Sequence, residues 1–154
     1  MNFSVDEALV RRSIQIAADA VTHGNHPFGA LLAKDGQILL EAENTIYTGH
    51  DITHHAETNL VRLAVQRYEF DFLEGCVLYT STEPCAMCSG AIYWSGIGAV
   101  VYACSAPRLA EFAGVGLEIR SSEVFASGTR KVTLIGPVLE DEAITVHAGY
   151  WKRQ

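Results

Sequence analysis

Two short motifs in this 154-residue sequence combine side chains that can bind a metal ion and move protons. The first is H-A-E at 55–57, and the second is P-C-A-M-C at 84–88, which begins 27 positions after Glu57. Together they supply one imidazole and two thiolates, and zinc prefers such ligands. Three protein ligands leave one tetrahedral position open for water, which is typical of a catalytic zinc site. Glu57 follows the histidine by two residues and can therefore act on that water without binding the metal.

The two cysteines alone would allow other interpretations. Cys85 and Cys88 form a C-x-x-C pair, which also occurs in redox centres and in structural zinc sites. A structural zinc site would need a second pair of ligands, and the sequence has no second C-x-x-C. Each motif begins a predicted helix, whose N-terminus favours an ionised thiolate. We therefore predict one Zn²⁺ per subunit, with His55, Cys85 and Cys88 as ligands and Glu57 as the catalytic proton shuttle.

Alternating helices and strands are expected to position these motifs. A capping box of Ser4 and Glu7 predicts where the first helix starts, and Asp35-Gly36 predicts a tight hairpin between the first two strands. The predicted helices cover 5–23, 55–68, 85–96, 105–112 and 139–151, and the predicted strands cover 28–34, 37–43, 76–82, 99–104 and 131–136. This order predicts a single α/β domain over 1–154, a three-layer α/β/α sandwich with a mixed five-stranded sheet and helices on both faces. The chemistry is then expected at strand-to-helix junctions on one edge of the sheet.

The overall charge and hydropathy restrict the class of partner. The formal net charge is −7, and the few basic residues are scattered, whereas proteins that grip a polyanion usually cluster them. This balance favours a small neutral substrate, and we do not expect a nucleic-acid partner. No apolar run approaches the roughly 20 residues that span a bilayer, and the first residues lack a signal-peptide pattern. We therefore expect no membrane partner and a cytoplasmic location.

The similarity to known proteins extends beyond the metal motifs. The stretches NHPFGALLAKDG, HAETN, STEPCAMCSGAIYWSG and AVVYA, together with Asn44, resemble the cytidine deaminase-like superfamily over about residues 5–112. Within it, the HPFGA and AIYW stretches are most similar to bacterial guanine deaminases and related nucleobase deaminases. Bacterial tRNA adenosine deaminases share the metal motif and much of the hairpin. The resemblance implies zinc-dependent hydrolytic deamination of a free nucleobase or related amino-heterocycle, guanine-type first, with nucleoside or tRNA adenosine deamination as the alternative.

The same resemblance implies roles for individual residues and an oligomeric state. Asn44 matches a residue that hydrogen-bonds the base, and Phe28 matches an aromatic residue that packs against the ring. The backbone N–H of Ala56 is expected to meet a ring carbonyl, and Trp94 is expected to form a further wall of the pocket. A homodimer is expected by family likeness.

Other roles stay open at this stage. In the guanine branch an acidic side chain downstream of the metal helices often engages the purine, and Glu111, Glu118 and Glu123 are the candidates. The C-terminal Tyr150-Trp151 segment either closes over an active site, its own or a partner's, or packs its aromatic rings on the sheet as part of a final helix. Glu83 is interpreted as setting the turn before the metal helix.

Overall fold

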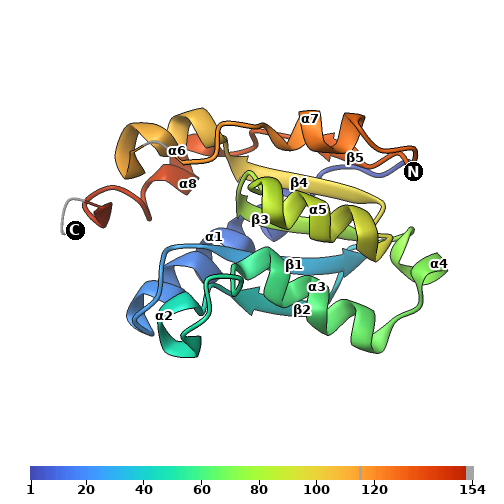
Figure 1. The fold of residues 1–154 in the computed structure, drawn as a ribbon, viewed down its shortest axis with the longest axis horizontal. Coiled ribbons are helices and arrows are strands. Elements are labelled where there is room, and N and C mark those ends of the chain that lie inside the picture. Colours follow the sequence, from blue (N-terminus) through green and yellow to red (C-terminus); the bar gives the residue numbers. More distant parts are fainter. Residues whose placement is uncertain (115, 152–154) are drawn as a thin grey trace.

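A five-stranded mixed sheet lies at the centre of the computed structural model, which describes residues 1–114 and 116–151 (Figure 1). Its strand order is β2-β1-β3-β4-β5. The strands are β1 (Gly29–Lys34), β2 (Gln37–Glu43), β3 (Val77–Thr82), β4 (Ala99–Cys104) and β5 (Thr133–Ile135). β1 runs antiparallel to β2 and β3, whereas β4 runs parallel to β3 and β5 runs parallel to β4. The expected mixed five-stranded sheet is confirmed.

The hairpin between β1 and β2 has the predicted turn. Asp35 and Gly36 have φ values of 50° and 76°. Two consecutive left-handed residues form the two-residue turn whose twist matches that of the flanking strands. The pair Lys34 and Gln37 closes the ladder directly at the turn.

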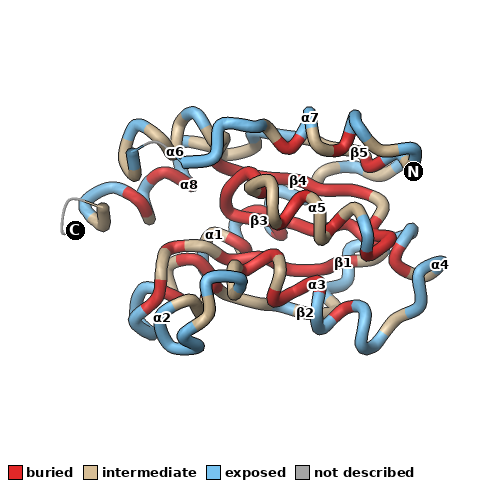
Figure 2. Tube along the Cα trace, viewed as in Figure 1, coloured by how far each residue is buried: buried red, intermediate tan, exposed pale blue. Residues whose placement is uncertain are grey.

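Helices cover both faces of the sheet, as expected. They are α1 (Glu7–Thr22), α2 (Ile46–Gly49), α3 (Ala56–Arg67), α4 (Phe70–Leu73), α5 (Ala86–Ser95), α6 (Ala106–Ala113), α7 (Ser121–Ala126) and α8 (Glu140–Ile144). Side chains alternate along each strand, so Ala30 and Leu32 pack with α3, α5 and α7, whereas Leu31 and Ala33 pack with α1, α6 and α8. Figure 2 shows β1, β3 and β4 as buried strands between these layers.

The start of the first helix differs from the prediction. The helix begins at Glu7, and its N-cap is Asp6, whose Oδ1 accepts a 2.9 Å hydrogen bond from the Ala8 N–H. The capping box proposed for Ser4 was therefore wrong, because the aspartate immediately before the helix already caps the first turn.

The expected final helix over 139–151 was also wrong. α8 ends at Ile144, and the chain continues through turns to Trp151. Gly149 has a φ of 83°, which ends any regular helix before that point. In the segment that had no clear pattern, residues 121–126 form α7. None of the described helices is long and apolar enough to cross a membrane.

Candidate active site

Two helix N-termini on the same face of the sheet bring the metal-binding motifs together. His55 is the N-cap residue of α3, and Cys85 is the N-cap residue of α5. Cys88 lies in the first turn of α5, so the C-x-x-C spacing places both sulfur atoms at one end of that helix. β3 leads into α5 through Glu83 and Pro84. The site therefore forms at a strand-to-helix junction, as expected.

The three donor atoms have the spacing that one zinc ion requires. His55 Nδ1 lies 3.6 Å from Cys85 Sγ and 3.4 Å from Cys88 Sγ. With Zn–N near 2.0 Å and Zn–S near 2.3 Å, tetrahedral angles separate nitrogen and sulfur by about 3.5 Å. All three donor atoms lie within 4.8 Å of one another. His55, Cys85 and Cys88 thus form a potential zinc site by geometry as well as by donor chemistry.

Hydrogen bonding within the cluster changes the acidity of its members. Hydrogen bonds from Cys88 and His55 together lower the pKa of the Cys85 thiol to about 4, although burial opposes this. The hydrogen bond to Cys85 raises the pKa of His55. One thiolate is therefore already favoured at this position, and thiolate is the form that binds zinc.

Glu57 lies beside this cluster in a buried position. Its side chain extends from the first turn of α3, and the residue is 4% exposed. The Thr80 hydroxyl donates a 2.6 Å hydrogen bond to Oε1, and Oε2 lies 3.5 Å from Cys88 Sγ. Burial raises the pKa of the carboxyl group, although the Thr80 hydrogen bond opposes this. The carboxyl group is thus fixed next to the metal-binding atoms, yet it is not one of the three clustered donors.

A cavity of about 280 Å³ opens onto these groups. It is lined by Phe28, His55, Glu57, Thr82, Glu83, Cys85, Leu109, Gly116 and Leu117. A second hollow of about 500 Å³ shares five of these residues and extends along α6 to Trp151. Its walls include Leu109 and Leu117, so the approach to the cluster is largely apolar. Small-ligand sites typically combine such walls with a few placed polar groups.

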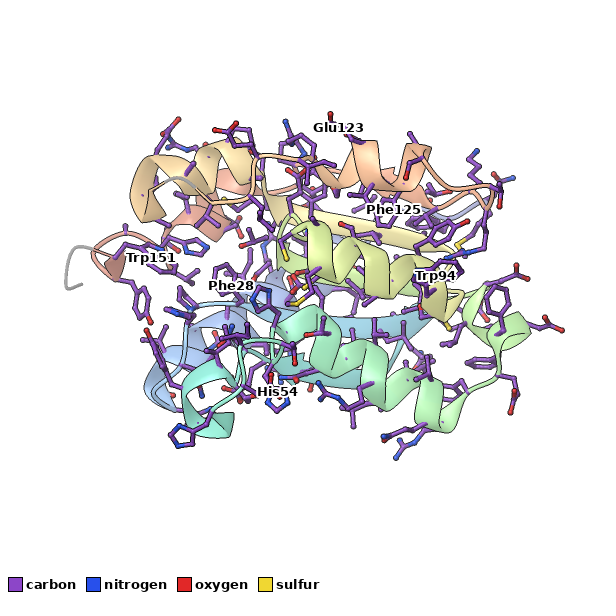
Figure 3. The ribbon with its side chains drawn as sticks, viewed as in Figure 1. Phe28, His54, Trp94, Glu123, Phe125 and Trp151 are labelled. Atoms are coloured by element: carbon purple, nitrogen blue, oxygen red, sulfur yellow. The ribbon has the colours of Figure 1, made fainter. Side chains whose placement is uncertain are left out.

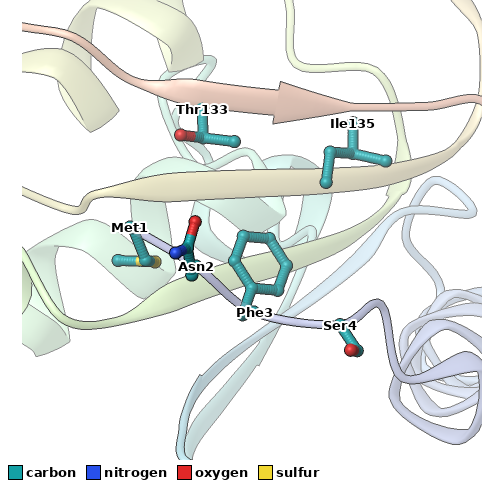
Figure 4. Close-up of a pocket in the computed structure, with 6 residues that line it drawn as sticks. All are labelled: Met1, Asn2, Phe3, Ser4, Thr133 and Ile135. Atoms are coloured by element: carbon teal, nitrogen blue, oxygen red, sulfur yellow. The ribbon is translucent and has the colours of Figure 1, made fainter.

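A hollow of about 510 Å³ lies far from this chemistry. It is formed by residues 1–4 together with Thr133 and Ile135 of β5 (Figure 4). None of these described lining side chains is titratable, so the hollow offers neither a metal site nor an acid–base pair.

The structure brings three of the four expected substrate contacts near the cluster. Phe28 lines the cavity, and its carbonyl accepts a 3.1 Å hydrogen bond from the Asn44 N–H. Ala56, between His55 and Glu57, is the first residue of α3 and is fully buried. Trp94 is 81% exposed and lies towards the C-terminal end of α5, well apart from Phe28 (Figure 3). The interpretation of Trp94 as a wall of the pocket was therefore wrong.

None of the three candidate acidic residues lines the metal cavity. Glu111 pairs with Arg108 on α6. Glu118 lines only the neighbouring hollow. Glu123 accepts a 2.8 Å hydrogen bond from the Arg120 N–H at the start of α7, and its side chain lies on the outer side of that helix (Figure 3).

Glu83 is a buried carboxylate whose role was underestimated from the sequence. Its oxygens accept hydrogen bonds of 2.9 and 3.0 Å from Arg120, 2.8 Å from the Ala106 N–H and 3.0 Å from the Ser121 hydroxyl. Burial raises the pKa of Glu83, but these donors outweigh burial and hold the pKa below its usual value. Glu83 therefore ties the starts of α6 and α7 to the loop before Cys85, which is more than setting a turn.

The C-terminal aromatic residues lie against the site of their own chain. The Tyr150 hydroxyl is 2.8 Å from His26 Nδ1, and the Trp151 ring stacks on His26 at a centroid distance of 5.0 Å. Trp151 also lies 6.2 Å from the Phe28 ring, and Figure 3 shows the two side chains next to each other. The turn after α8 thus replaces the expected helix and covers the site from one side.

The comparison with protein families identifies this metal centre. The family model of the cytidine and deoxycytidylate deaminase zinc-binding region matches residues 3–104, which include all three donors and Glu57. The chain belongs to this family. It is therefore a zinc-type hydrolytic deaminase, and zinc is its metal.

The similar proteins act on different bases. The deaminase is 39% identical over 152 residues to a probable cytosine deaminase of Schizosaccharomyces pombe, an alignment that covers 95% of this chain and 92% of the relative. It is 42% identical over 106 residues to a guanine deaminase of Bacillus subtilis, and this match covers 68% of each chain. The structure of a guanine deaminase from Nitrosomonas europaea superposes with a TM-score of 0.83 over 99% of this chain and 87% of that one; at 23% identity it shows the shared fold.

Proposed function

We propose that this deaminase removes the exocyclic amino group of a free nucleobase or related amino-heterocycle and releases ammonia. The proposal is carried by the buried Glu57 carboxyl group beside the His55, Cys85 and Cys88 donors, at the end of a cavity of about 280 Å³. This volume lies near the lower end of small-molecule pockets. It suits a single flat ring system, whereas a polynucleotide would need an open groove.

The side chains of this site divide the reaction between them. When bound by its three ligands, zinc supplies the Lewis acidity that brings the pKa of water near neutrality. Glu57 accepts the proton of the attacking water and delivers it to a ring nitrogen. Glu57 next takes the remaining proton of the hydroxyl group added to the ring and passes it to the amino group, which departs as ammonia while the ring carbonyl forms. The hydrogen bond from Thr80 holds Oε1 in place, so the carboxyl group needs little reorientation between these transfers.

The proposed contacts to the substrate ring come from Phe28, which lines the cavity, and from Asn44 and Ala56, which lie next to lining residues. Phe28 provides an aromatic face that can pack against a flat ring. Asn44 Oδ1 accepts a 3.1 Å hydrogen bond from the Ile46 N–H, which orients the amide so that Nδ2 remains to donate to the base. The N–H of Ala56, at the start of α3, is a second donor for a ring carbonyl.

The ring itself is proposed to be a base that carries both an amino and an oxo group, such as guanine or cytosine. The likeness to the named cytosine and guanine deaminases supports this choice. The net charge of −7 supports a free base over tRNA.

Ammonia release tests this proposal directly. Zinc-loaded protein is incubated with guanine, cytosine, their nucleosides and a tRNA anticodon stem-loop, with Glu57→Gln as the blank. Turnover of a free base supports the proposal. Turnover restricted to nucleosides or RNA would overturn the substrate assignment. The proposed roles of the catalytic groups would still hold.

A further inference from the structure

Thr82 lines the metal cavity together with Glu57 and Cys85, and its side chain carries a hydroxyl group. The residue is the last of β3 and is 3% exposed. Its Oγ1 lies 3.3 Å from Nε2 of His147, a fully buried side chain after α8. The indole N–H of Trp151 in turn donates a 3.1 Å hydrogen bond to His147 Nδ1. A chain of hydrogen bonds therefore runs from Trp151 through His147 to Thr82.

This chain has only one consistent set of hydrogen positions. An indole N–H can donate but cannot accept, so His147 Nδ1 must be the acceptor and carries no hydrogen. Burial lowers the pKa of His147 to about 4, which agrees with a neutral ring near pH 7. A neutral imidazole keeps one hydrogen, which must then lie on Nε2. Nε2–H consequently donates to Thr82 Oγ1.

The hydroxyl proton of Thr82 is available to donate a hydrogen bond to a ligand. In the described part of the chain, the hydrogen bonds of Thr82 Oγ1 comprise only the contact with His147. Since that contact uses the oxygen as an acceptor, the hydroxyl can still donate one hydrogen bond. Asn44 is oriented in the same sense, because Ile46 N–H occupies its Oδ1 and leaves the Nδ2 donors. The free hydroxyl proton of Thr82, which lines the cavity, thus favours a ligand that presents an acceptor, and the Asn44 amide next to Phe28 has the same preference.

We propose that Thr82 is a specificity-determining donor that selects rings bearing an oxo group, and that His147 and Trp151 position its hydroxyl. This inference rests on the proposed deamination of a free base. An amino group in place of the oxo group could reach only the remaining lone pair of Oγ1, and it would leave the hydroxyl proton of Thr82 without an acceptor. Sites built to bond one polar group reject the wrong analogue by several orders of magnitude, so a preference of at least about 100-fold is expected here.

Pairs of bases that differ in this one group provide the test. Values of kcat/KM are measured for guanine against 2,6-diaminopurine and for cytosine against 2,4-diaminopyrimidine, using wild type, Thr82→Val and Thr82→Ser. Thr82→Val keeps the side-chain shape and should lower kcat/KM for the preferred oxo base by about 10- to 100-fold, with little change for its diamino partner. Thr82→Ser should keep the wild-type preference. Equal losses for both members of a pair, or no loss, would overturn the assignment.

The positioning role of the two aromatic residues needs a separate comparison. Trp151→Phe keeps a ring but removes the donor to His147 Nδ1, so the oxo preference should fall several-fold. In the Thr82→Val background the same change should add almost nothing, because residues that act through one another are not additive. Fully additive effects would show that Trp151 acts independently of Thr82.

Equilibrium binding separates this inference from the proposed function. Guanine, cytosine and their two diamino analogues are titrated into the zinc-loaded Glu57→Gln protein by calorimetry, with and without Thr82→Val. An oxo preference that Thr82→Val abolishes supports the inference, even where wild type releases no ammonia and the proposed function fails. Equal or undetectable binding of all four bases overturns it.

Discussion

The hydroxyl of Thr80 donates a 2.6 Å hydrogen bond to Oε1 of Glu57. Thr80 is on β3 and Glu57 is on α3, and both residues are almost completely buried. The strand that leads into the metal-binding loop therefore also fixes the rotation of the carboxyl group. This arrangement couples the sheet to the carboxyl group proposed as proton shuttle, whose other oxygen, Oε2, lies 3.5 Å from Cys88 Sγ.

Loss of this hydroxyl should reduce turnover and spare the metal. Thr80→Val is expected to lower kcat by about 5-fold, because the net contribution of one hydrogen bond is about 1 kcal/mol. Glu57→Gln should lower kcat by at least about 1000-fold, since it removes the proton acceptor. Both variants should retain one zinc per chain by elemental analysis. Thr133→Val, on β5 away from the site, serves as the matched control, and wild-type kcat in Thr80→Val would contradict the positioning role.

Zinc binding should depend on the three clustered donors. Cys88→Ala and His55→Ala are expected to lose the metal and all measurable turnover, because two donors hold zinc poorly. A chelator should lower the Tm of wild type but leave that of Cys88→Ala unchanged, since only the former gains stability from bound metal. Cys104→Ala is the control, because Cys104 is also a buried free cysteine but lies outside the cluster. Normal zinc content in Cys88→Ala would refute this ligand set.

The ion pair of Arg120 and Glu83 should stabilise the protein more than a surface pair does. The Glu83 side chain is 1% exposed, so Arg120→Met leaves a buried carboxylate with fewer donors and should cost about 2 kcal/mol of unfolding free energy. The control is Arg11→Met, which breaks the solvent-exposed pair with Glu142 and should cost less than about 1 kcal/mol. Urea denaturation of both variants gives the comparison. Equal losses would show that burial of Glu83 is energetically irrelevant.

Acid should destabilise the protein partly through His147. Burial lowers the folded-state pKa of this side chain from 6.5 to about 4, so the unfolded chain binds a proton first as the pH falls. Its contribution to stability is complete above about pH 6.5 and is lost as the pH falls towards about 4, a change of about 3 kcal/mol. Urea titrations at about pH 7 and about pH 4.5, with chelator present, should show a flatter pH dependence for His147→Gln. His50→Gln, at an exposed position, should keep the wild-type slope.

Local sequence was sufficient for the metal motif and the hairpin. His55 and Glu57 are two residues apart at one helix start, and Cys85 and Cys88 share one helical turn, so backbone geometry alone brings each pair together. Asp35-Gly36 likewise determines its own turn, because the left-handed conformation is a property of those two residues. Such short-range geometry can be predicted without knowledge of the rest of the chain.

The exposed position of Trp94 shows why the sequence pattern of α5 did not predict which of its side chains line the pocket. α5 is apolar on nearly all sides, so its sequence does not specify which face is buried. Packing on the sheet buries Cys88 and Ile92, which are one turn apart. Trp94 follows Ile92 by two residues and hence lies about 200° further round the helix, where it faces solvent.

The donor residues, the carboxyl group of Glu57 and the order of the five strands along the chain could be predicted from the amino-acid sequence, because short motifs and local periodicity carry these features. The polar contacts around the cavity were decided by the tertiary structure. Glu83 and Arg120 are 37 positions apart, and Thr82 and His147 are 65 positions apart. Contacts across such distances depend on how the sheet and the turn after α8 pack, and no local periodicity encodes that packing.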